Sequence, residues 1–336
     1  MAALVWFVHG QLAARGFDWA LVRAGIAGLR WNWLAFSLIP IFATYYGRAL
    51  RWAVFLKPLK PHPSLARLTS ATVIGFTAIT LFGRPGEFIR PYLIAKKEDV
   101  SITSQFAAWF LERIFDLLMA LLVFAFALTR VRGSEVQVGD KMAWVMAVGG
   151  RIVVVACATI LIVILSFRHL ARPLQERITG ALHFLPQHHF ERLAKWIAAF
   201  VEGVASTRSD AALLLIFFYS VVEWMLIAAC YWCLAHSFAA TMNFTIVDVL
   251  IFLGFVSFGA AVQIPGIGGG MQVVAVLVLT ELFGMRLELA TAFAFLTWFL
   301  TFVAIVPVGL ILALKEGLDW RGTLRDVRRI GEEASK

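Results

Sequence analysis

Charged residues are scarce in this sequence. Aspartate, glutamate, lysine and arginine make up 15% of the 336 residues, whereas a typical soluble domain carries about 25%. Hydrophobic residues reach 61%, and no soluble fold of this length can bury that excess. The composition therefore argues against a soluble enzyme, a nucleic-acid-binding protein, a disordered scaffold and a secreted disulfide framework. It favours an all-α bundle that crosses the membrane several times.

Cysteine is also rare. The three cysteines, Cys157, Cys230 and Cys233, all lie inside apolar stretches, a pattern that indicates no disulfide framework. Cys230 and Cys233 alone lack the four ligands of a structural zinc site. His188 and His189 are adjacent and have no third ligand at helical spacing. We therefore expect neither a metal nor another cofactor.

The apolar run at the N-terminus, residues 1–14, has no lysine or arginine ahead of it, so it does not have the form of a signal peptide. It is also too short to cross a bilayer, which takes about 20 residues of helix. We interpret it as the end of a membrane helix, with a short surface helix as the open alternative.

The sequence predicts a single transmembrane domain over residues 1–336. The apolar stretches long enough to cross the bilayer cover residues 31–56, 106–128, 143–167, 211–234 and 289–314. Three further stretches are shorter or less apolar, and they cover residues 65–83, 246–263 and 271–283.

Basic residues exceed acidic residues by 30 to 21, which gives a formal net charge of +9. In a membrane protein such a surplus marks cytoplasmic loops that face the anionic leaflet. On this rule we place the polar segment 168–210 and the basic tail 315–336 in the cytoplasm. The sequence thus predicts a multi-pass protein of the cell membrane, with membrane lipids and not nucleic acid as its partners.

The stretch 65–83 has positive charge at both ends, in residues 48–60 and 84–97. A full crossing would place one of these groups outside the cell, so we interpret the stretch as re-entrant: it enters from the cytoplasm and returns. The stretches 246–263 and 271–283 flank a glycine break and are predicted to enter from the opposite face. Paired broken segments are typical of inverted-repeat transporters, whose sites lie near the midplane. Ordinary short helices in a tight bundle are the alternative.

The first candidate site is the motif Arg84-Pro85-Gly86-Glu87, followed by Arg90. Pro85 and Gly86 break the preceding helix, and Glu87 favours the positive end of the next one. Arg84 and Arg90 could clamp a phosphate, because a guanidinium offers several fixed donors. The motif predicts substrate binding by Arg84, Glu87 and Arg90, whereas a plain basic loop is the alternative.

The second candidate site is a group of charges inside an apolar span. Glu112 and Asp116 share a helix face, and Arg113 lies three residues before Asp116. Arg113 and Asp116 cost roughly 5–7 kcal/mol at a helix centre, and about thirteen large apolar residues return roughly 4–8 kcal/mol. The three charges are therefore predicted to face the interior and bind substrate, or else to form a structural ion pair. Arg151 and Glu223 are further buried candidates that could pair.

The third candidate site is the glycine-rich break at residues 265–270. Its glycines, represented by Gly266, Gly268 and Gly269, allow the backbone to approach a ligand closely. A helix that starts just after the break would aim its amide groups at an anion. We predict substrate contact at these three glycines, with close helix packing as the alternative.

These motifs also resemble a known family. Residues 84–93 followed by 111–116 are similar to the G-E-x-x-R segment and the E-R-x-x-D helix of the transmembrane, flippase-like domain of lysylphosphatidylglycerol synthases. Residues 48–52 resemble the R-x-x-R-W start of that domain, and the likeness covers roughly residues 31–314. The glycine break is similar to the family's P-G-G-x-G segment, but Gln272 stands near the place where a glutamate usually follows.

The resemblance implies an integral membrane protein of the lipid-translocating type, in a polytopic all-α bundle. Synthases carry a separate soluble domain that makes the aminoacylated lipid, and the tail 315–336 is too short for one, so we expect no enzyme activity. The implied substrate is a polar-headgroup lipid, whether an anionic phospholipid, a glycolipid or a hopanoid-type lipid, and lipid-synthesis enzymes are candidate partners. The alternative is a non-transporting scaffold or accessory subunit of a lipid-modifying transferase.

The re-entrant interpretation predicts the sidedness of two positions. Single cysteines at Ser64 and Lys96, in a background without the native cysteines, should both react with an impermeant reagent from the cytoplasmic side only. The positive charge on both flanks of residues 65–83 is the reason. Labelling of the two positions from opposite sides would show that this stretch crosses the membrane.

Overall fold

The computed structural model describes residues 17–132, 153, 155–160, 162, 209–260, 263–264 and 268–335. The predicted span 143–167 is described only in fragments, and nearly all of the segment 168–210 lies outside the described residues. The following positions discussed above also lie outside them: residues 1–14, Arg151, His188, His189 and Gly266.

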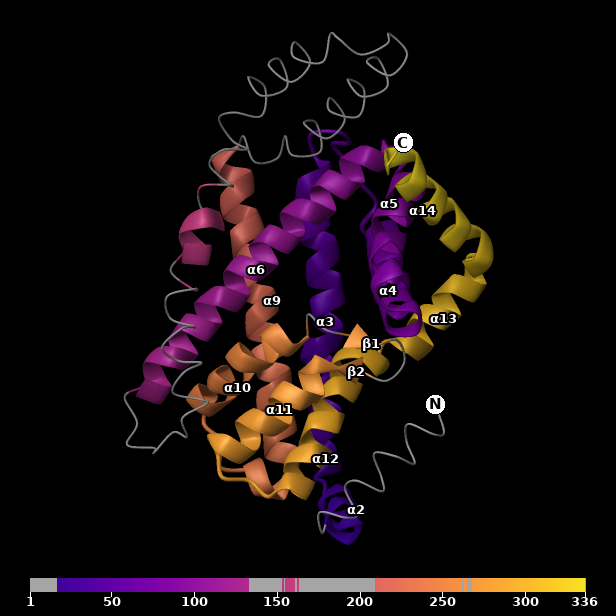
Figure 1. The fold of residues 1–336 in the computed structure, drawn as a ribbon. Coiled ribbons are helices and arrows are strands. Elements are labelled where there is room, and N and C mark those ends of the chain that lie inside the picture. Colours follow the sequence, from indigo (N-terminus) through magenta and orange to yellow (C-terminus); the bar gives the residue numbers. More distant parts are fainter. Residues whose placement is uncertain are drawn as a thin grey trace.

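The described chain is an all-α bundle of the polytopic membrane type (Figure 1). Its first half contains α2 (Trp19–Ala27), α3 (Trp31–Leu56), α4 (Leu65–Phe82), the 3-10 helix η1 (Arg84–Phe88), α5 (Ile89–Glu98) and α6 (Ile102–Arg132). Its second half contains α9 (Asp210–Ser237), η3 (Ala239–Thr241), α10 (Ile246–Gly259), β1 (Gln263–Ile264), β2 (Gly268–Gly269), α11 (Gly270–Glu281), α12 (Leu287–Trp298), the π-helical turn η4 (Phe299–Val303), α13 (Val306–Lys315) and α14 (Trp320–Ser335).

Four described stretches of helix are long and apolar enough to cross a membrane, and a fifth is added if α2 and α3, which are bent by 80°, count as one span. The four are Leu65–Phe82, Ile102–Val131, Asp210–Ser237 and Leu287–Lys315. The predicted spans 106–128, 211–234 and 289–314 fall on three of these four stretches, and the predicted span 31–56 falls on α3 of the bent pair. The fourth stretch, Leu65–Phe82, was predicted to be re-entrant and not a span. In the structure the chain turns back after it.

Helix α4 is the first limb of a helical hairpin. Its first turn is capped by Ser64, and it ends at Gly83, whose φ of 69° lies in the region that favours glycine. Through η1 the chain reverses into α5. The backbone N–H of Ser64 donates to Glu98 Oε2 at 3.4 Å, and Arg67 Nη1 donates to the carbonyl of Lys97 at 3.0 Å. The start of α4 therefore lies beside the end of α5.

The hairpin turns at η1, inside the bundle, and this corrects the sequence prediction for residues 84–97. We expected those residues to lie on the cytoplasmic side, with the dip confined to residues 65–83. Instead η1 forms the tip of the hairpin, and α5 is its returning limb, buried at Ile89, Arg90 and Leu93. Only the end of α5 returns to the opening.

Helices α10 and α11 form a second hairpin. A capping box of Thr245 and Asp248 starts α10. At the tip, β1 and β2 pair antiparallel, with Ile264 opposite Gly268. A Cβ atom at Gly259 would lie 2.5 Å from the carbonyl oxygen of Gly270, so the two limbs are close where they meet.

The two hairpins open at opposite ends of the bundle. Helices α3 and α9 are antiparallel, since the N–H of Arg30 donates to the carbonyl of Ser237 at 2.9 Å, and Arg51 Nη1 donates to Ser220 Oγ at 2.8 Å. The first hairpin follows the end of α3, and the second follows the end of α9. In Figure 1 the two tips approach each other near the middle of the bundle. The geometry is that of two opposed helical hairpins, whereas their re-entrant course through the membrane and the membrane side of each opening stay predictions.

The last helices enclose the first hairpin. Thr80 Oγ1 donates to the carbonyl of Phe302 in η4 at 2.9 Å, and Gly309 in α13 leaves the space that Thr77 occupies. The tail folds as α14 beside α5 (Figure 1), where Tyr92 Oη donates to Asp326 Oδ2 at 2.8 Å. From the sequence we expected only a polar, basic tail in the cytoplasm. In the structure this tail forms a helix that packs against the first hairpin.

The tip of the first hairpin depends on the small size of Gly86. A Cβ atom there would collide with the backbone of Ala78 and Ile79, and overpacking of this kind costs about 1–3 kcal/mol. Gly86→Ala should therefore lower the melting temperature in detergent. Gly47→Ala is the matched control, because nothing lies within 4 Å of its added Cβ atom. Equal melting temperatures for the two variants would contradict the close packing.

Candidate functional site

Two arginines of α3 form the centre of the candidate site. Arg48 and Arg51 are three residues apart, so they share a helix face. We had assigned them to the basic cytoplasmic end of the span 31–56, but the structure places both inside the bundle. Arg51 is 0% exposed and the side chain of Arg48 is 13% exposed. A buried guanidinium needs partners on every side, and α6 and α9 supply them.

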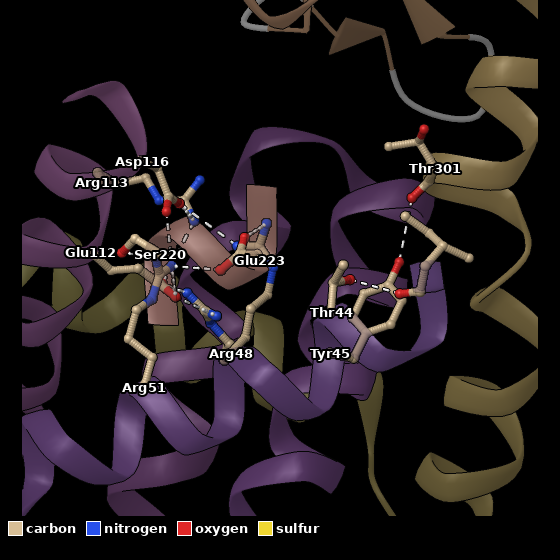
Figure 2. Close-up of polar contacts among 12 residues, drawn as sticks. Thr44, Tyr45, Arg48, Arg51, Glu112, Arg113, Asp116, Ser220, Glu223 and Thr301 are labelled. Atoms are coloured by element: carbon tan, nitrogen blue, oxygen red, sulfur yellow. Dashed lines mark hydrogen bonds and ion pairs between the residues drawn. The ribbon is translucent and has the colours of Figure 1, made fainter. Parts of the chain in front are cut away.

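Arg51 joins three helices. Its Nη2 atom lies 2.8 Å from Glu112 Oε1, 2.8 Å from Asp116 Oδ1 and 3.2 Å from Glu223 Oε2. Its Nη1 atom donates to Ser220 Oγ at 2.8 Å. Figure 2 shows these carboxylates converging on the guanidinium. Since Glu112 is 0% and Glu223 is 1% exposed, this part of the cluster is sealed from the surroundings.

Arg90 ties the first hairpin to the same cluster. Its Nη1 atom donates to Glu112 Oε1 at 3.2 Å, and its Nη2 atom forms an ion pair with Glu112 Oε2. The guanidinium also stacks 4.4 Å from the ring of Trp52 and 5.3 Å from that of Phe76. Arg90 was predicted to clamp a phosphate. In the structure its guanidinium contacts Glu112, Trp52 and Phe76, and Arg90 does not line the cavity described below. Its structural role is to anchor the hairpin.

Arg48, Arg113 and Asp116 form a second, more accessible layer. Arg113 Nη2 lies 3.0 Å from Asp116 Oδ2, and Arg48 Nη1 lies 3.6 Å from the same oxygen. Arg48 also forms an ion pair with Glu223 and lies over the ring of Phe76 at 4.7 Å. The side chain of Arg113 is 38% exposed. These charges are paired with one another, yet they remain open to a ligand on one side.

That open side is a cavity of about 420 Å³, within the usual range of ligand pockets, roughly 300–1,000 Å³. Arg48, Arg113 and Asp116 line it. The first hairpin contributes Ile79 and Glu87, and the helices of the second hairpin contribute residues that include Ser257 and Met271. One cavity therefore joins the intramembrane charges to both hairpins.

The cavity also has a neutral polar wall at the π-helical turn η4. Tyr45 Oη donates to the carbonyl of Thr301 at 3.3 Å (Figure 2). Tyr231 Oη and Thr301 Oγ1 lie 3.1 Å apart. All three side chains line the cavity. A ligand there meets charges on one wall and hydroxyl groups on another.

A family model described as lysylphosphatidylglycerol synthase TM region matches residues 1–309. The chain belongs to this family. Its members' shared part is a membrane domain that is often flippase-like. The match confirms the resemblance stated from the motifs, although it begins earlier than we expected and ends before α14. No curated protein matches the chain, and no solved structure does.

The remaining predicted residues of this family member fall in different places. The side chain of Arg84 and the whole of Gly266 lie outside the described part of the chain. Gly268 and Gly269 form β2, and the N–H of Gly269 donates to Gln272 Oε1 at 2.7 Å. That amide, predicted to contact an anion, is therefore already used by a side chain of the same turn.

Sequence reasoning missed the role of α3. The R-x-x-R-W pattern of Arg48, Arg51 and Trp52 was noticed only as part of the family likeness, although two arginines at helical spacing in an apolar helix are a signal of an intramembrane site. The partners of Glu223 are these arginines, whereas its predicted partner Arg151 lies outside the described residues. In the described part of the chain, no group of three histidine, cysteine or acidic side chains could hold a metal ion.

Removing the charge of a carboxylate should cost more stability in the sealed part of the cluster than in the accessible layer. Glu112→Gln leaves two buried arginines short of a carboxylate, and breaking a buried ion pair costs about 3–5 kcal/mol. We expect a large fall in melting temperature for Glu112→Gln and a smaller one for Asp116→Asn, which faces the cavity. Glu281→Gln, at an exposed position of α11, is the control. If Glu112→Gln melts like the control, the cluster does not hold the helices together.

Proposed function

We propose that this protein moves the headgroup of a polar lipid between the two leaflets of the membrane. The observation that carries the proposal is a cavity that is lined both by the two hairpins and by charged residues of the bundle interior. The lipid tails would remain in the bilayer while the headgroup crosses through the cavity. The proposal involves no covalent step, so it treats the chain as a transporter and not as an enzyme.

The cost of intramembrane charge supports this proposal. Charged residues in membrane-spanning segments are rare, and they typically mark a pathway for a polar substrate. A purely structural cluster would bury all its charges, as Arg51, Glu112 and Arg90 do. Arg113 and Asp116 instead face a cavity, where a headgroup can exchange its water shell for their charges.

The apolar part of the cavity wall supports lateral access for a lipid. Leu117 lines the cavity and is 46% exposed on the same helix as Arg113 and Asp116. An exposed leucine beside charges that line the cavity is the arrangement that a lipid needs, with its tail outside and its headgroup within. Phe76 and Phe302 extend this apolar wall on the first hairpin and on η4.

We propose that a phosphate is captured by arginines other than Arg90. Arg90 is committed to Glu112, so among the described side chains the guanidinium groups that line the cavity are those of Arg48 and Arg113. Arg113 is the more accessible of the two. A guanidinium offers fixed donors that match the oxygens of a phosphate.

The proposal predicts that Arg113→Gln slows lipid movement about tenfold, because a hydrogen bond to a charged group contributes about 1.5–3 kcal/mol. The measurement is the leaflet distribution of a tail-labelled phospholipid in vesicles that contain the purified protein. Arg130→Gln is the matched control, since Arg130 lies exposed on the same helix, outside the cavity.

Two results would contradict the proposal. The first is a wild-type protein that moves no anionic, zwitterionic or glycosylated lipid faster than empty vesicles. The second is a rate that falls equally for Arg113→Gln and Arg130→Gln. Either result would favour a non-transporting scaffold, for which the sealed ion pairs of Arg51 are the structural argument.

A further inference from the structure

Of the described charged residues that line the cavity, Glu87 is the one with no partner. It lies in η1, at the tip of the first hairpin, and lines the cavity with a half-buried side chain. No hydrogen bond or ion pair joins it to any residue that the structure describes. The other cavity-lining charges, Arg48, Arg113 and Asp116, all have opposite charges close by. An unpaired carboxylate in such a site favours a cation.

The position of Glu87 is held by its neighbours. Gly86 packs against the backbone of Ala78, and Gly83 ends α4 just before the turn. Phe88, which follows Glu87, contacts the rings of Phe106 and Trp109, with centroids 5.8 and 5.3 Å away. The carboxylate therefore belongs to a packed turn, and its approach to the cavity is fixed by the fold.

Among the residues that the structure describes, the charges of the cavity wall balance without a ligand. Arg48 and Arg113 contribute two positive charges, and Glu87 and Asp116 contribute two negative charges. Behind the wall, the two arginines Arg51 and Arg90 are matched by Glu112 and Glu223. A ligand with a net negative charge would disturb this balance, whereas a ligand with one charge of each sign would preserve it.

The arginines of the wall also offer donors to a ligand. Arg48 and Arg113 line the cavity, and their side chains are 13% and 38% exposed. Their guanidinium groups can donate to phosphate oxygens on the open side. The cavity thus has donors on its arginines and an unpaired acceptor on Glu87, and a ligand with groups of both kinds would use both.

We infer that the cavity selects a zwitterionic lipid headgroup, in which a phosphate lies beside an ammonium group, and that Glu87 is the residue that selects it. The phosphate accepts hydrogen bonds from Arg48 and Arg113, and the ammonium group donates to Glu87. A headgroup with a phosphate and no cation leaves Glu87 unpaired and adds a like charge to the wall. This inference rests on the proposed function and narrows its substrate class.

The test uses two tail-labelled lipids, phosphatidylethanolamine and phosphatidylglycerol, so that the label leaves both headgroups intact. Initial rates of movement are measured for the full chain in vesicles. We expect the wild-type protein to move phosphatidylethanolamine faster. In Glu87→Gln that rate should fall about tenfold and the phosphatidylglycerol rate should rise, because the variant loses the ammonium acceptor and the repulsion of phosphate together.

Two controls separate selection from a structural role of Glu87. Glu87→Asp keeps the charge and should retain the preference in part, and Glu281→Gln on the exposed face of α11 should leave the ratio of rates unchanged. If Glu87→Gln slows both lipids by the same factor, Glu87 only supports the hairpin and the inference is overturned. A wild-type preference for phosphatidylglycerol would overturn it as well.

A binding measurement keeps this result distinct from a failure of the proposed function. The purified protein is equilibrated with equal amounts of both lipids, and the retained lipids are quantified by mass spectrometry. The inference predicts an excess of phosphatidylethanolamine on the wild-type protein that disappears in Glu87→Gln. If this excess is found but neither lipid moves between leaflets, the transport proposal fails alone. If the retained ratio is the same for both proteins, the inference fails whatever the rates.

Discussion

The rest of the structure depends on the ion pairs that the guanidinium of Arg51 makes inside the bundle. This guanidinium is fully buried, and its contacts with Glu112, Asp116 and Glu223 join α3, α6 and α9. The same Glu112 accepts from Arg90, so the first hairpin is held by the cluster that holds the bundle. A buried charge is costly unless it is paired on every side. This requirement fixes how the three helices are rotated, and that rotation turns Arg48, Arg113 and Asp116 toward the cavity.

The cavity follows from two further constraints, the opposed hairpins and the π-helical turn. Helical hairpins that open at opposite ends bring their tips together inside the bundle, where non-helical backbone is tolerated only if protein or a cavity surrounds it. The π-helical turn η4 forms another wall of the cavity, where Thr301 is hydrogen-bonded to Tyr45 and Tyr231. Charged, hydroxyl and apolar walls therefore meet in one space, the combination that a lipid headgroup with attached tails requires.

Much of the fold could be predicted from the sequence, and less of the site. The apolar stretches predicted the long helices. The positive charge on both sides of residues 65–83 indicated a segment that returns to the side it came from. The position of the turn was missed, because Pro85 and Gly86 suit a surface loop as well as a buried tip. Arg48 and Arg51 were placed at a cytoplasmic end, since their partners are on helices far away in the chain and pairing of this kind is tertiary. The Gly269 amide was expected to be free, and only the folded turn shows that Gln272 occupies it.

The central claim is that the cavity between the two hairpins holds a lipid headgroup. An experimental structure of the full chain in a lipid nanodisc tests it most directly. The account predicts density for a headgroup in the cavity, with a phosphate within hydrogen-bonding distance of Arg48 or Arg113 and acyl chains that leave past Leu117. Lipid density confined to the outer surface of the helices, with the cavity filled only by water or by side chains, would contradict it.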